Sequence, residues 1–108
     1  MNYKNLALKY LEAFESKNID LIQEIFSNEV KLIDWEVDLE GKENVINNIK
    51  MVFNSIEVID IKIVELYQEE KTVISKMIIK LDHIKLYIVD ILKFSEDGKL
   101  LEINAFKG

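Results

Sequence analysis

Residues 85–94 read KLYIVDILKF, and this stretch decides how the rest of the chain is interpreted. Neighbouring side chains of a β-strand point to opposite faces, so Ile88, Asp90 and Leu92 share one face of the predicted strand. Asp90 therefore lies among apolar residues. Because an ionised carboxylate is costly to bury without a partner, an acid at such a position is usually paired, protonated or functional.

Composition limits the classes of protein to which the chain can belong. With 108 residues, about half of them apolar, we expect residues 1–108 to form one domain with a single core. The formal net charge of −6 disfavours nucleic acid and anionic membranes as partners. All fourteen basic residues are lysine, so no arginine is present to bind phosphate or carboxylate through two parallel hydrogen bonds. Cysteine is absent, which excludes disulfides, thiolate metal sites and a cysteine nucleophile.

The sequence contains no pattern that is typical of targeting to a membrane. Charges interrupt the N-terminal residues every few positions, unlike the apolar core of a signal peptide, and no later apolar run is long enough to cross a bilayer. We therefore expect a cytoplasmic protein that binds neither membrane nor nucleic acid.

The spacing of apolar residues predicts three helices followed by a sheet. Residues 2–16, about 19–26 and 44–55 show helical spacing, and a break at Asn28-Glu29 precedes a strand whose apolar side includes Asp34. After Ser55 the pattern alternates over residues 57–68, 72–81, 85–94 and 100–106, with polar turns between these segments. Helices followed by consecutive strands indicate an α+β fold with a curved, mainly antiparallel sheet wrapped on helices.

Three polar residues lie on faces that should belong to the core: Tyr10 on the first helix, Asp34 on the first strand and Asp90. Each has an ordinary structural interpretation. A tyrosine in a helix stripe is often a core residue with its hydroxyl at the surface, and an acid at a strand end is often exposed. Asp90 is equally consistent with a neutral or hydrogen-bonded structural acid.

The order and setting of these residues resemble the nuclear transport factor 2-like superfamily, in particular its ketosteroid isomerase and SnoaL-like branches. YLEAFESKNIDLIQEIF at residues 10–26, the strand ending in Asp34 and the following EGKENV resemble the N-terminal half of that family. IVDILKFSEDGKLLEINAFKG at residues 88–108 resembles its last hairpin. The resemblance implies a cone-shaped fold in which three N-terminal helices pack on a curved, mainly antiparallel sheet that encloses a cavity.

The resemblance also implies a role for each of the three polar residues. Tyr10 falls where ketosteroid isomerases carry an oxyanion-hole tyrosine, Asp34 where they carry the base, and Asp90 where they carry a protonated acid. Moving a double bond into conjugation with a ketone needs a base at carbon and donors at the developing enolate oxygen. Asp90 can donate only while protonated, and an apolar face favours that form; ketosteroid isomerase is a known case of this arrangement.

Further positions complete the expected site. We expect the substrate cavity to be lined by Phe14, Trp35, Leu86, Ile88 and Ile103. Trp35 stands where the family commonly has proline after the base, and packing of this residue against a dimer partner is an equally good interpretation. A homodimer through the outer sheet face is implied by the resemblance and is consistent with apolar residues opposite Asp90, namely Tyr87, Val89 and Ile91.

Residue types that are absent from the sequence distinguish the chain from other enzymes of the superfamily that it resembles. Limonene-epoxide-hydrolase-like members need an arginine between two acids, and scytalone-dehydratase-like members need more than one histidine, whereas His83 is the only one here. We expect His83 to be solvated in a turn and expect no metal or other cofactor. The sequence thus predicts an isomerase- or cyclase-type enzyme acting on a small apolar carbonyl compound. The alternative is a non-catalytic module of the same fold that binds a small ligand or a partner protein.

Overall fold

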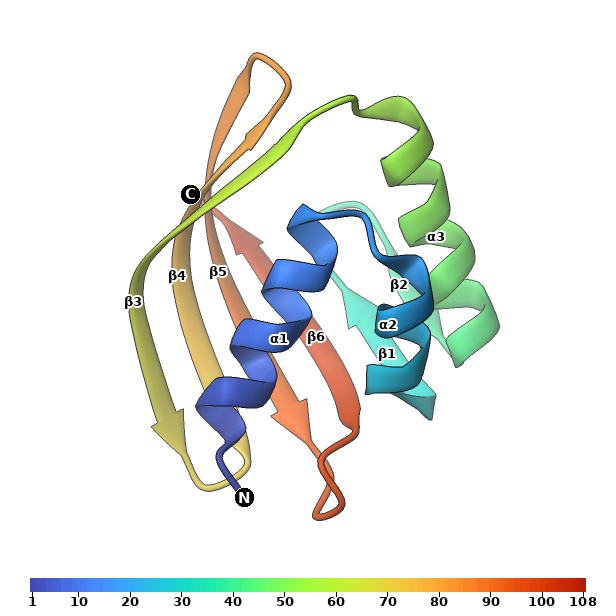
Figure 1. Cartoon of the computed structure of the whole chain (residues 1–108), viewed down its shortest axis with the longest axis vertical. Helices are drawn as coiled ribbons and strands as arrows, with labels where there is room; N and C mark the ends of the chain where they lie inside the picture. Colours follow the sequence, from blue (N-terminus) through green and yellow to red (C-terminus); the bar gives the residue numbers. More distant parts are fainter.

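The computed structural model describes all 108 residues and places three helices on one side of a six-stranded sheet (Figure 1). The prediction of an α+β fold with a curved, mainly antiparallel sheet is confirmed. No helix is both long enough and apolar enough to cross a membrane. In chain order the elements are α1 (Tyr3–Glu15), α2 (Ile19–Ile25), β1 (Phe26–Ile33), β2 (Asp38–Glu40), α3 (Lys42–Ser55), β3 (Ile59–Glu69), β4 (Thr72–Leu81), β5 (Ile84–Phe94) and β6 (Leu100–Lys107).

Local side-chain contacts fix where the first two helices begin. The side chain of Asn2 accepts a hydrogen bond from the backbone N–H of Asn5 at 3.0 Å, and Asn18 accepts one from Leu21 at 3.2 Å. Both bonds satisfy a backbone donor that has no partner within its helix. Gly41 precedes α3 with a φ of 90°, a conformation that residues with a side chain rarely adopt.

The strands run in the order β2-β1-β6-β5-β4-β3, and every neighbouring pair is antiparallel except β1 and β6. The predicted break at Asn28-Glu29 was wrong, because β1 begins at Phe26 and contains both residues. Their polar character is tolerated because both side chains are exposed, and the register of β1 with β6 shifts between Phe26 and Lys31. Asp34 follows β1 instead of ending it.

The helices cover the inner face of the sheet, and the core lies between these two layers. Helix α1 packs on β3 and β4, while α3 packs on β1 and β2 (Figure 1). Apolar side chains such as Ile88 and Leu92 of β5 and Met77 of β4 point into this core. Apart from the hydroxyl of Tyr10, the buried polar side chains are those of Ser75 and Asp90, which are directly opposite each other on neighbouring strands.

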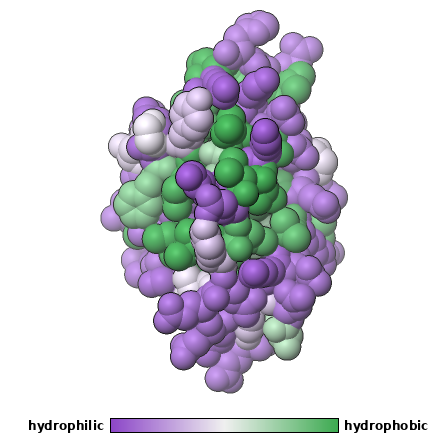
Figure 2. Space-filling view, turned by 90° about the vertical axis from the view of Figure 1, so that its left-hand side faces the viewer, coloured by the Kyte–Doolittle hydropathy of each residue, from purple (hydrophilic) through white to green (hydrophobic).

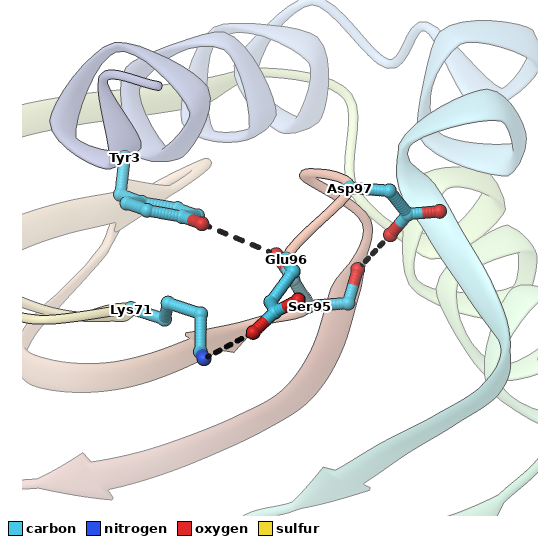
Figure 3. A network of polar contacts seen from close by, with 5 residues as sticks. All are labelled: Tyr3, Lys71, Ser95, Glu96 and Asp97. Carbon is cyan, nitrogen blue, oxygen red and sulfur yellow. Dashed lines mark hydrogen bonds and ion pairs between the residues drawn. The ribbon is translucent and has the colours of Figure 1, made fainter.

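The turn between β5 and β6 is tied to α1 and to the β3–β4 turn (Figure 3). The hydroxyl of Tyr3 donates to the backbone carbonyl of Ser95 at 3.5 Å, and Lys71 Nζ lies 3.7 Å from the carboxylate of Glu96. Within the turn, the Ser95 hydroxyl donates to Asp97. Since the ion pair is exposed, its contribution to stability is small, and the contacts mainly set the geometry of this end of the sheet.

Candidate functional site

A cavity of about 180 Å³ lies between the helices and the inner face of the sheet. Of its seventeen lining residues fourteen are hydrophobic, so the few polar groups in its wall stand out. The structure brings all eight residues predicted for the site to this one cavity, namely Tyr10, Phe14, Asp34, Trp35, Leu86, Ile88, Asp90 and Ile103.

Asp90 lies in the middle of β5 and is 8% exposed. Alternation along the strand turns its carboxyl toward the cavity, and no hydrogen bond to the protein contributes to its pKa. Burial raises the pKa of Asp90 from 3.8 to about 7, and the negative charge of Asp34 adds to the effect. Asp90 is therefore a neutral hydrogen-bond donor at weakly acidic pH.

Tyr10 reaches the cavity from α1 and is 4% exposed. Its ring is held between the rings of Phe14 and Phe26, with centroid distances of 6.3 and 6.0 Å. Burial raises the pKa of the Tyr10 hydroxyl above its usual value, and the Asp90 charge raises it further. Tyr10 is thus a second neutral donor whose position is set by aromatic packing.

Asp34 occupies a tight turn that follows β1. Its Oδ1 accepts hydrogen bonds from the backbone N–H groups of Glu36 at 2.7 Å and Val37 at 2.9 Å. The backbone N–H of Asp34 donates to the Val37 carbonyl at 3.0 Å, which closes the turn. The side chain therefore stabilises its own loop through one oxygen, while the other oxygen makes no hydrogen bond within the protein and is available to a ligand.

Trp35 lies in the wall of the cavity but is 44% exposed, so it borders the mouth. Lys107 Nζ lies 5.3 Å from the centroid of its ring, within the range of a cation–π contact. One of the two interpretations of Trp35, a position beside Asp34 at the cavity mouth, agrees with this placement. Packing of Trp35 on a partner chain remains an untested expectation.

Residues 7–103 match the model of the SnoaL-like domain family. The chain belongs to that family. The resemblance inferred from residues 10–26 and from the last hairpin is thereby confirmed. No curated protein is matched by the sequence.

Solved structures share the fold of this SnoaL-like domain. A protein of unknown function from Cytophaga hutchinsonii, described as nuclear transport factor 2-like, has a TM-score of 0.86 at 11% identity over 100% of this chain and 91% of its own. A candidate ketosteroid isomerase from Kribbella flavida has a TM-score of 0.86 at 12% identity, covering 98% and 77%. A candidate SnoaL-like polyketide cyclase from Shewanella denitrificans has a TM-score of 0.85 at 16% identity, covering 98% and 90%. At such identities the likeness establishes the fold and leaves activity open.

One polar residue of the SnoaL-like domain's cavity was missed from the sequence. Asn48 of α3 lines the cavity, is partly buried and makes no hydrogen bond through its side chain within the protein. It stands in the apolar stripe formed by Val45, Ile49 and Val52, at the spacing of one helix face. A polar residue in such a stripe is the signal that singled out Tyr10, so Asn48 could have been found in the same way.

Acidic and histidine side chains form no candidate metal site in the SnoaL-like domain. No group of three or more His, Cys, Asp or Glu residues is arranged to hold a metal ion. His83 is exposed in the turn between β4 and β5 and lies outside the cavity wall. The chemistry available in the cavity is therefore that of two carboxyl groups, one hydroxyl and one amide, together with the indole of Trp35 at the mouth.

Proposed function

We propose that this SnoaL-like domain is an enzyme of isomerase or cyclase type that moves a proton next to the carbonyl group of a small apolar compound. The observation that carries the proposal is the convergence of Tyr10, Asp34 and Asp90 on one apolar cavity. Neutral donors in a water-poor wall stabilise an oxyanion more strongly than they would in water. Asp90, which is kept protonated at pH 6 to 7, can act as a hydrogen-bond donor, while the partly exposed Asp34 can act as the base.

The reaction proceeds through an enolate and needs no cofactor. The ionised carboxylate of Asp34 takes a proton from the carbon between the carbonyl and the double bond, and the C–H electron pair moves into the conjugated system. Negative charge develops on the carbonyl oxygen, where Tyr10 and protonated Asp90 donate hydrogen bonds. Asp34 then returns the proton at the far carbon of the former double bond, so the product is the conjugated isomer with the same atoms.

The test follows the conversion of a β,γ-unsaturated cyclohexenone and of a β,γ-unsaturated ketosteroid to conjugated enones by ultraviolet absorbance. Asp34→Asn is the matched variant, because asparagine keeps the oxygen that accepts from Glu36 and Val37 and loses only the base. We expect the variant to be slower by about 10²–10⁴-fold, the usual effect of removing a general base. Equal rates for both proteins on every ketone tested would overturn the isomerase assignment.

A non-catalytic ligand-binding module of the same fold is the second candidate. It is favoured by the two backbone donors that already use Oδ1 of Asp34, because a carboxylate that shapes its loop has a structural reason to be present. Binding of a carbonyl compound at the cavity without turnover, and equally by the wild type and Asp34→Asn, would favour this module over the enzyme.

We also propose that the protein forms a homodimer through the outer face of the sheet. Ile74, Tyr87 and Phe106 are apolar residues of that face and are 36%, 54% and 51% exposed. On the side where β3 and β4 lie, Figure 2 shows hydrophobic side chains gathered in the middle with some hydrophilic ones among them, and mainly hydrophilic ones above and below. An apolar centre with a polar rim is the usual anatomy of a protein interface.

Sedimentation measures the dimer directly. We expect the wild type to sediment as a dimer and Tyr87→Glu to sediment as a monomer, because an interface centre excludes an unpaired charge. Met51→Glu is the matched control, since Met51 is 69% exposed on α3, away from the outer face. A wild type that is monomeric at all concentrations would contradict the proposal.

A further inference from the structure

The size of the cavity limits the ligand that it can enclose. Sites that enclose drug-sized molecules measure roughly 300–1,000 Å³, whereas an apolar cavity of about 150 Å³ holds one benzene molecule. The cavity here measures about 180 Å³. The enclosed space has room for one ring with a few substituent atoms, and most of a fused four-ring skeleton would have to lie outside it, beyond the mouth at Trp35.

The charge of the cavity wall limits the ligand further. Its polar residues are Asp34, Asn48, Asp90 and the hydroxyl of Tyr10, and neither lysine nor histidine is among the lining residues. An anionic group inside the cavity would meet two carboxyl groups and no lining cation, since Lys107 lies over the Trp35 ring at the mouth, so carboxylates and phosphates are disfavoured. The occupant that suits this wall is electrically neutral.

Asn48 supplies a recognition group that the proton transfer does not use. Its side-chain amide offers both a donor and an acceptor, and it reaches the cavity from α3, whereas the catalytic groups come from α1, from β5 and from the turn after β1. Because a polar group that loses water without gaining a partner is costly, an amide in a mainly apolar wall favours ligands that bind it.

We propose that the site takes a neutral, single-ring carbonyl compound that carries a second hydrogen-bonding group, and that Asn48 binds this group. The inference rests on the proposed function in using the same cavity, and it assigns the size, charge and second polar group of the ligand. Asn48 is thereby a specificity-determining residue.

A series of phenols tests the size limit without requiring turnover. A phenol is a planar ring whose oxygen can occupy the position of the enolate oxygen, so phenol, naphthol and a four-ring steroidal phenol form a series in size. Isothermal titration near pH 6, where Asp90 is protonated, measures each dissociation constant. An unrestricted apolar site binds larger members more tightly because they bury more apolar area. We expect the opposite order, with affinity falling at least about tenfold, or about 1.4 kcal/mol, from one ring to four. Equal or tighter binding of the steroidal phenol, or no binding of any phenol, would overturn the size limit.

A second titration tests the role of Asn48. Ethylphenol and hydroxymethylphenol, as meta and para isomers, have similar shapes and differ by one hydroxyl group. We expect the wild type to prefer one hydroxymethyl isomer over its ethyl counterpart, and Asn48→Leu to reduce this preference about tenfold, the value of one good hydrogen bond. Asn47→Leu is the matched control, because Asn47 is the exposed neighbour on the same helix. An unchanged preference in Asn48→Leu would remove the proposed contact.

The two tests separate this inference from the proposed function. Selective binding of single-ring phenols without any ketone isomerisation would leave the ligand class in place and reject the enzyme. Fast isomerisation of the ketosteroid, with tight binding of the steroidal phenol, would support the enzyme and reject the size limit.

Discussion

Replacing Asp90 by asparagine should change how the stability of the protein depends on pH. The pKa of Asp90 is 3.8 in the unfolded chain and about 7 in the fold, mainly because of burial and next because of the Asp34 charge. Between these values the folded state binds a proton that the unfolded state has released, so stability falls as pH rises through this window. At about 1.4 kcal/mol per pKa unit, the total loss is about 4 kcal/mol, of which about 3 kcal/mol falls between about pH 5 and about pH 8.

Urea denaturation of the wild type and Asp90→Asn at both pH values measures this loss. The net charge of −6 also destabilises the fold as pH rises, but it does so almost equally in both proteins, so the difference between them isolates Asp90. We expect Asp90→Asn to gain about 3 kcal/mol relative to the wild type between about pH 5 and about pH 8. When Asp34 is replaced by asparagine in both proteins, the negative charge near Asp90 is gone. The pKa of Asp90, and with it the pH range over which stability falls, should then move to lower pH. A difference between wild type and Asp90→Asn that does not vary with pH would refute the assignment of a neutral Asp90.

Three further predictions concern the same cavity. Tyr10→Phe keeps the packing on Phe14 and Phe26 but loses the hydroxyl, so we expect the isomerisation rate to fall about 10²–10³-fold while the urea midpoint changes little; an unchanged rate would exclude Tyr10 as an oxyanion donor. The wild-type rate should fall above about pH 7 as Asp90 loses its proton, and Asp90→Asn, which keeps a donor, should not show this fall; a pH–rate profile measures it. Ser75→Ala should raise the free energy of unfolding by about 1 kcal/mol, because the Ser75 hydroxyl is buried and has no hydrogen-bond partner; a loss of stability on urea denaturation would show that this hydroxyl is satisfied.

The fold was largely predictable because apolar residues recur at clear helical or strand spacing along its elements. The alternation around Asp90 and from Val73 to Met77 matches the inner faces of β5 and β4. The start of β1 was not predictable, because Asn28 and Glu29 are polar, and the pairs that place this segment beside β6, at Phe26 and Lys31 on either side of them, are distant in sequence. The bulge between Ile63 and Glu65 is likewise a property of the pairing of β3 with β4.

The site was predictable to the extent that polar residues interrupt apolar stripes. Tyr10 and Asp90 were found in this way, and Asn48 carries the same signal in α3. Two properties required the folded chain. One is the turn in which Asp34 binds the backbone of Glu36 and Val37, and the other is the cavity volume, which depends on how closely the helices pack on the sheet.

The turn at Asp34 has a stereochemical consequence. Two backbone donors hold Oδ1, so the carboxylate cannot rotate about its own axis without breaking both hydrogen bonds, and in the proposed reaction Oδ2 is the oxygen that exchanges protons. A single oxygen that removes a proton from one carbon and delivers it to another works from one side of the ligand plane. Deuterium placed at the carbon between the carbonyl and the double bond should therefore reappear on the same face of the ring, at the carbon that receives the proton. The fraction of deuterium retained should rise with how well the cavity excludes water during the lifetime of the enolate.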